Sequence, residues 1–166
     1  YRYHHLFAEI LHERLQREDP ALLALCHRRA AQWFQQHDML DSAIRHLIAA
    51  QAFEDAVTLI AAKADQLILR GEAAELVTWV RALPLAVIQT HSHLCVLFAV
   101  GLFLQGETVE ATACVNDLEQ RLAKSDTQSF IVESEIAVLR AILTLVAGDI
   151  FVGTELAREA ARHLPE

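Results

Sequence analysis

Histidines and paired carboxylates are the side chains of this sequence whose spacing could support chemistry. His91 and His93 form an HxH pair that could supply two ligands to a metal ion, but no acidic third ligand lies nearby in the sequence, and Cys95, two residues further on, is interpreted below as a core thiol. Glu133 and Glu135 are two residues apart, which places them on different faces of a helix. No Ser, Cys or Thr lies in a nucleophile motif. We therefore expect no metal, no cofactor and no catalytic residue in this chain.

The cysteines and tryptophans all lie in apolar, helix-like contexts. Cys26, Cys95 and Cys114 are odd in number and widely spaced, so we expect reduced thiols in the core and a cytoplasmic setting. Trp33 and Trp79 fall on apolar stripes, and we interpret both as core residues. The alternative for the tryptophans is a ligand-stacking role.

Arg140 is the charge that stands out, because it interrupts a continuous apolar stretch between residues 136 and 143. A charge inside an apolar helix is costly unless it is paired. One interpretation is an arginine at the edge of the buried stripe, with its stem packed and its head in solvent. The other is a partly buried charge that pairs with a carboxylate at a seam between repeats, or with a ligand.

Composition restricts the fold and the partners. Of the 166 residues 54% are hydrophobic and only 5 are Gly and 3 Pro, which favours helix over a turn-rich all-β fold. Lys and Arg number 14 against 22 Asp and Glu, a net charge of −8 with no basic stripe, so we expect neither nucleic acid nor an anionic membrane as a partner. The longest apolar run, 94–104, is shorter than the ~20 residues of a membrane span.

Apolar residues recur at intervals of three and four along the chain, which predicts about nine helices and no strand. Asp19 and Pro20 form a helix start, and Asp41 is the expected cap of a following helix. We expect the polar stretch 89–93 to separate two helices and 125–127 to form a loop.

The helix breaks are regularly spaced. Asp38, Gly71, Gly106 and Gly148 are separated by 33, 35 and 42 residues, close to the period near 34 of tetratricopeptide repeats. The pattern predicts an all-α array of tetratricopeptide-like helix pairs forming a right-handed superhelix. An irregular helical bundle with evenly spaced loops is the alternative.

Small residues follow the breaks at the position where paired helices pack closely. Ala43, Ala111 and Gly153 each lie five residues after a break. Leu76 occupies the same position after Gly71, so the second unit departs from the pattern. We therefore expect a degenerate repeat.

The repeat register also predicts a binding face. In tetratricopeptide-like arrays the first helix of each pair lines a concave groove. The candidate groove residues are mostly polar, and a polar ligand or a peptide is the expected occupant; a merely solvated face is the alternative. They are Arg28, Gln32, Gln35, Thr58, Asp65, His93, Phe103 and Glu135.

An ordered set of short motifs resembles one family. Residues 1–11, YRYHHLFAEIL, are similar to the (Y/F)RYHxLFxxFL segment of large bacterial ATP-dependent LuxR-type transcriptional regulators, the MalT-like group. Matching blocks follow in the same order: HRRAAQWF at 27–34, AIRH at 43–46, LRGE at 69–72, and the pairs LP at 83–84 and LC at 94–95.

The resemblance implies a domain organisation within a longer protein. Residues 1–18 would be the tail of a winged-helix segment, and 19–166 would begin a helical-repeat sensor that continues further. ATP binding and DNA binding would lie elsewhere, and the chain indeed lacks a P-loop, since neither Lys63 nor Lys124 follows a Gly. The implied role is a sensor or interaction segment that binds a small-molecule effector or a protein partner and controls activation.

Two other functions stay open at this stage. A generic tetratricopeptide-like scaffold for proteins or peptides would need no inducer, and a helical enzyme is the least favoured, so we expect no enzymatic activity. Because the chain begins at Tyr1 without Met, we interpret it as a piece of something longer. Tyr1, Tyr3, Leu6 and Phe7 would then have lost a packing partner, and we expect exposed apolar patches and self-association.

Overall fold

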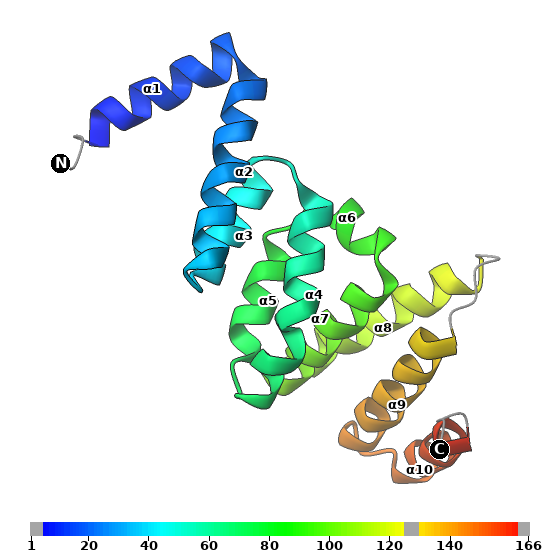
Figure 1. The fold of residues 1–166 in the computed structure, drawn as a ribbon. Helices are drawn as coiled ribbons and strands as arrows, with labels where there is room; N and C mark the ends of the chain where they lie inside the picture. The colour runs from blue at the N-terminus through cyan, green and yellow to red at the C-terminus, as the bar shows by residue number, and fades with distance from the viewer. Residues whose placement is uncertain (1–4, 125–129, 163–166) are drawn as a thin grey trace. The chain divides into compact units, whose positions relative to one another are not determined.

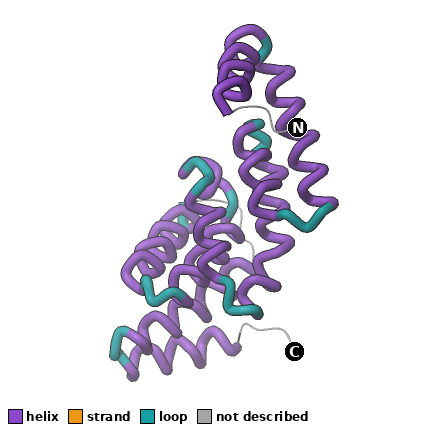
Figure 2. Tube along the Cα trace, turned by 90° about the vertical axis from the view of Figure 1, so that its left-hand side faces the viewer, coloured by secondary structure: helices purple, strands orange, loops and turns teal. Residues whose placement is uncertain are grey.

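Ten α-helices account for most of the chain, and the computed structural model contains no strand in the residues it describes, 5–124 and 130–162 (Figures 1 and 2). The all-α class predicted from the periodicity is confirmed. The helices are α1 His5–Glu18, α2 Pro20–Gln36, α3 Leu40–Ala49, α4 Phe53–Leu69, α5 Ala73–Arg81, α6 Leu85–Thr90, α7 Ser92–Leu104, α8 Thr108–Leu122, α9 Phe130–Val146 and α10 Ile150–Arg162.

The chain divides into two compact units, Tyr1–Ile60 and Ala61–Glu166. The first unit contains α1, α2, α3 and the beginning of α4; the second contains the end of α4 and all later helices. The superhelical course of the whole array and the boundary between 18 and 19 stay predictions.

Five turns between the helices share one geometry. In each, the second residue after the helix has a positive φ, between 54° and 96°. The amide of the next residue donates to the carbonyl five positions earlier at 2.8–3.2 Å, as in a Schellman motif. Four of these turns lie at the predicted breaks and join α2 to α3, α4 to α5, α7 to α8 and α9 to α10; the fifth follows α3. The positive-φ residues are Asp38, Gln51, Gly71, Gly106 and Gly148.

The small residues that follow three breaks are buried at helix contacts. Ala43 and Ala111 have no exposed surface. A Cβ on Gly153 would lie 2.6 Å from the Leu145 Cγ, so α10 packs against α9 at a distance that only glycine permits.

The structure explains why Leu76 departs from this pattern. Leu76 is fully buried, and the neighbouring α7 carries Gly101 opposite it. A Cβ on Gly101 would lie 2.8 Å from the Val77 Cγ2 and 3.6 Å from the Leu76 Cδ2. In this unit the small residue at the helix contact is therefore Gly101 of α7, and the large residue is Leu76 of α5.

Some predicted boundaries were right and others wrong. Asp19 caps α2, because its Oδ1 accepts from the Leu22 amide at 2.9 Å. Asp41 was wrongly predicted as a cap: it lies in the first turn of α3 and pairs with Arg45 at 3.0 Å. The stretch 89–93 is also largely helical, since α6 ends at Thr90 and α7 begins at Ser92. Residues 125–127 lie outside the described part of the chain.

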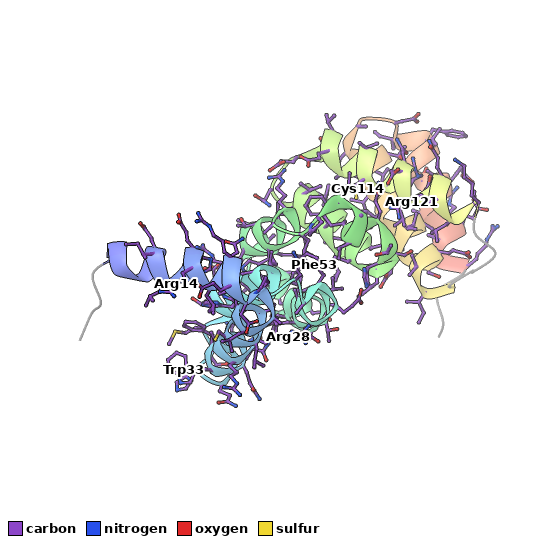
Figure 3. The ribbon with its side chains drawn as sticks, turned by 90° about the horizontal axis from the view of Figure 1, so that it is seen from above. Arg14, Arg28, Trp33, Phe53, Cys114 and Arg121 are labelled. Carbon is purple, nitrogen blue, oxygen red and sulfur yellow. The ribbon has the colours of Figure 1, made fainter. Side chains whose placement is uncertain are left out.

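Burial corrects two predicted core residues. Trp79 is buried as expected, but Trp33 is 49% exposed and Cys26 is exposed as well. Trp33 projects from α2 and stacks on the exposed ring of His37, with ring centroids 3.9 Å apart (Figure 3). The apolar stripe of α2 is wider than the surface that its neighbours α1 and α3 cover, so part of it faces solvent.

The most apolar helix is α7, with 13 residues. At 1.5 Å per residue it extends for about 20 Å, less than the thickness of a bilayer core. Among the described residues, no helix combines the length and the hydropathy that crossing a membrane requires.

Candidate functional site

The second unit carries an open groove of about 570 Å³, which we call the first-helix groove. Its walls come from the last turns of α4, from α7 and from α9, the first helices of three consecutive pairs. This volume is typical of ligand pockets. The lining residues are Asp65, Ile68, Val96, Leu97, Val100, Phe103, Leu104, Ile131, Ser134, Glu135, Val138, Leu139 and Ile142.

The repeat register explains why these residues meet. Asp65, Val100 and Ile142 each lie six residues before the glycine of their turn, and all three line the groove. His93 and Glu135 each lie thirteen residues before their glycine. Helices that pack in register bring such equivalent positions side by side, and the His93 Nδ1 lies 3.2 Å from the Glu135 Oε2.

The groove is apolar with carboxylates at its margin. Ten of the lining side chains are hydrophobic, and two are acidic, Asp65 and Glu135. None of the described residues that line it is Lys or Arg. The groove therefore offers an apolar floor and negative charge to an occupant.

The structure brings half of the predicted groove residues together. Asp65, Phe103 and Glu135 line the groove, and His93 is paired with Glu135 beside it. Thr58 belongs to the first unit and donates from its hydroxyl to the Glu54 carbonyl at 2.8 Å.

The other three predicted groove residues, Arg28, Gln32 and Gln35, are exposed on α2 in the first unit (Figure 3 labels Arg28). They are not among the residues that line the first-helix groove.

The sequence predicted a mostly polar face, whereas ten of the side chains that line the groove are hydrophobic. Val100 and Ile142 occupy the same register position as Asp65, so the repeat itself held the signal. The α7 helix is apolar all round, and such a helix can line a groove on one side while it packs in the core on the others.

A second pocket, of about 620 Å³, lies between α8, α9 and α10, on another side of α9. Arg140 lies at its wall and is 28% exposed. Its Nε donates to the Glu119 Oε1 at 2.7 Å, its Nη2 donates to the second Glu119 oxygen, and Nη2 also donates to the Asn116 Oδ1 at 2.6 Å. Arg140 thus joins α9 to α8 of the preceding pair by a bidentate ion pair.

The surroundings of the two thiols of the second unit disfavour the thiolate form. Burial raises the pKa of Cys95, and burial raises the pKa of Cys114 to about 12. The Cys95 Sγ donates to the Ile88 carbonyl at 3.0 Å, and the Arg121 Nη2 lies 3.4 Å from that sulfur. Cys114 and Arg121 both lie on α8 (Figure 3). A thiol that stays protonated is a poor nucleophile and a poor metal ligand.

The two histidines of the HxH pair point to different partners. The His91 Nδ1 lies 2.8 Å from the Val87 carbonyl oxygen, whereas His93 contacts Glu135. Over the residues that the structure describes, no three His, Cys, Asp or Glu side chains are placed to hold a metal ion.

Known proteins give one line of comparison. The chain is 29% identical over 164 residues to serine/threonine-protein kinase PknK from Mycobacterium tuberculosis and from Mycobacterium bovis. The alignment covers 96% of this chain but only 15% of each relative, so the chain is similar to a short segment of much longer proteins. No protein-family profile and no solved structure matches the chain.

Proposed function

We propose that this chain is the sensor or interaction segment of a larger bacterial regulatory protein, and that an occupant of the first-helix groove controls that protein. The observation that carries the proposal is the groove itself: it is open, apolar and built from equivalent positions of successive helix pairs. Pockets of this kind bind ligands, and concave faces of helix-pair arrays bind partners.

Two similarities support placing the segment in a regulator. Its ordered motifs resemble MalT-like transcriptional regulators, in which this region is the sensor. The PknK relatives are by name protein kinases, and the matched segment is a small part of their length. In either kind of protein, ATP binding and the effector function would belong to other parts of the polypeptide.

The groove suggests how occupancy would be transmitted. It spans α7 and α9, which belong to different helix pairs. Neighbouring pairs of a repeat array interact mainly with each other, so a ligand that contacts both pairs stabilises one relative arrangement of them. The Arg140–Glu119 pair joins the same two helix pairs and would help to transmit that preference.

We expect a binding role and no catalysis. The Cys95 and Cys114 thiols have raised pKa values, and the HxH histidines point to different partners. These features support a groove that holds its occupant without converting it.

A groove-directed substitution tests the proposal. Nile red, a neutral apolar dye, should bind the chain saturably with increased fluorescence. Val100→Glu places a charge on the groove floor and should weaken this binding at least about tenfold. Ala137→Glu is the matched control, because Ala137 lies on α9 but lines the second pocket. In the full-length parent protein, Val100→Glu should abolish regulation and Ala137→Glu should not. Equal effects of the two variants would overturn the proposal.

A further inference from the structure

We infer that the occupant of the first-helix groove is an amphipathic helix of a protein partner, with basic residues flanking its apolar stripe. This inference rests on the proposed function, because it takes the first-helix groove to be the binding surface. It goes further by naming the chemistry of the partner.

The shape of the groove fits a helix. The groove follows α9 from Ile131 to Ile142, which at 1.5 Å per residue is about 17 Å, or three turns of a helix. Its rim carries exposed apolar side chains, with Ile131 68%, Leu104 50% and Ile142 37% exposed. These side chains lie at solvent-accessible margins, so an occupant that covers them must be larger than a molecule held inside the cavity. An amphipathic helix laid along a groove covers such a rim with residues at i, i+3, i+4 and i+7.

The charge of the groove selects a basic partner. Asp65 and Glu135 are its acidic lining residues, and none of the described lining residues is Lys or Arg. Covering Asp65 with an apolar or acidic surface would remove its carboxylate from water without compensation, and Glu135 would keep only its contact with His93. Lys or Arg side chains beside the apolar stripe of the partner would pair with them. The net charge of −8 on the whole chain would add long-range attraction for a basic segment.

The register also suggests the spacing of the basic residues. Asp65 lies six residues and Glu135 thirteen residues before the glycine of the respective turn. Seven residues correspond to about 10 Å along a helix. Asp65 and Glu135 lie on different walls, α4 and α9, so a partner helix aligned with α7 would meet both with basic residues at j and j+6, one on each flank of its apolar stripe.

Fluorescence anisotropy with three synthetic peptides tests the inference on the whole chain. The first peptide has a leucine stripe with one Lys on each flank, at j and j+6; the second replaces both Lys with Glu; the third has the composition of the first in a scrambled order. The first peptide should bind at least about tenfold more tightly than the other two, and its binding should weaken as salt increases.

Matched variants locate the charge pairing. Asp65→Asn combined with Glu135→Gln should weaken binding of the Lys peptide about tenfold and flatten its salt dependence. Glu133→Gln on the same helix is the control, because Glu133 lines the second pocket, and it should leave binding unchanged.

The outcomes separate this inference from the proposed function. Equal binding of the Lys and Glu peptides, or of the scrambled peptide, overturns the inference. Binding of a small apolar amine such as hexylamine in the absence of any peptide binding also overturns it, in favour of a small cationic effector. In both cases, weaker Nile red binding in Val100→Glu than in Ala137→Glu would still support the groove as the functional site. Equal Nile red binding by the two variants would overturn the proposed function as well.

Discussion

The Nδ1 atoms of His27 and His46 lie 2.8 Å apart, and this contact joins α2 to α3 in the first unit. One ring must donate and the other accept, so the contact exists only while at least one imidazole is neutral. His12 of α1 packs edge-on against His27 at a centroid distance of 5.7 Å, and Phe34 stacks on His46 at 5.2 Å. Histidine rings therefore take part in the contacts of α2 with both α1 and α3.

This cluster predicts loss of stability in mild acid. Burial lowers the pKa of His27, with further lowering by the charges of His46 and His12, and burial lowers the pKa of His46. Below pH ~6.5 the unfolded chain takes up protons that the folded chain resists, so the free energy of unfolding decreases as pH falls through that value toward the lowered pKa values. Thermal unfolding followed by circular dichroism between pH 8 and 5 should show a decreasing Tm.

A stacking-compatible substitution provides the control for this prediction. His46→Phe keeps a ring against Phe34 but removes the titrating partner, and it should flatten the decrease in Tm. His93→Gln, in the second unit, should leave the decrease in place. An unchanged pH profile in His46→Phe would contradict the assignment to this cluster.

The positive-φ turns predict that glycine stabilises the chain at the positive-φ position and destabilises it at the position just before. Gln51 has φ 54°, where a residue with a Cβ is strained, so Gln51→Gly should raise the free energy of unfolding by about 0.5–1 kcal/mol. Gln105→Gly is the matched control, because Gln105 precedes a turn glycine and has φ −84°; it should lower the free energy of unfolding. Urea unfolding measures both changes, and a gain in both variants would contradict the argument.

The Arg140–Glu119 ion pair predicts a modest coupling between neighbouring helix pairs. Its side chains are 28% and 40% exposed, so solvent screening limits its contribution. A double-mutant cycle with Arg140→Met and Glu119→Gln should give a coupling energy of about 0.5–1 kcal/mol that decreases with added salt. The exposed Arg158–Glu155 pair within α10 should give a smaller coupling energy. Equal coupling energies would contradict the prediction that the pair between α8 and α9 is the stronger one.

Thiol exposure predicts reaction at a single cysteine. Cys26 is exposed, whereas Cys95 is buried and Cys114 has a pKa of about 12. Ellman's reagent at pH 8 should modify one thiol per folded chain rapidly and the other two only after denaturation. The rapid phase should be lost in Cys26→Ser and retained in Cys114→Ser. A rapid phase that survives in Cys26→Ser would contradict the assignment of the fast reaction to Cys26.

The apolar tip of the last helix pair predicts self-association. Ile150 is 68% and Phe151 77% exposed beside the turn at Gly148. Contiguous exposed apolar side chains favour contact between molecules. Sedimentation velocity should show association that increases with concentration and is reduced by Phe151→Glu. Ala157→Glu, an exposed change on the same helix, should leave it intact; a monomer at every concentration would refute the prediction.

Local features of the sequence determined the helices and the turns. Gly71, Gly106 and Gly148 allow a left-handed turn residue wherever they occur, and apolar spacing of three and four defines a helix without knowledge of its neighbours. The repeat register, counted back from the breaks, predicted that Asp65, Phe103 and Glu135 share a groove, and all three line it.

Tertiary structure alone decided what covers each apolar stripe. Trp33 and Cys26 lie on a stripe like that of buried Trp79, yet they are exposed, because no neighbouring helix covers that part of α2 in the described structure. The apolar floor of the groove could not be predicted from the sequence either. Val100 has the sequence pattern of a core residue, but it lines the space between α4, α7 and α9. Hydrophobicity specifies that a side chain gains from burial, but whether it is buried depends on packing between distant segments.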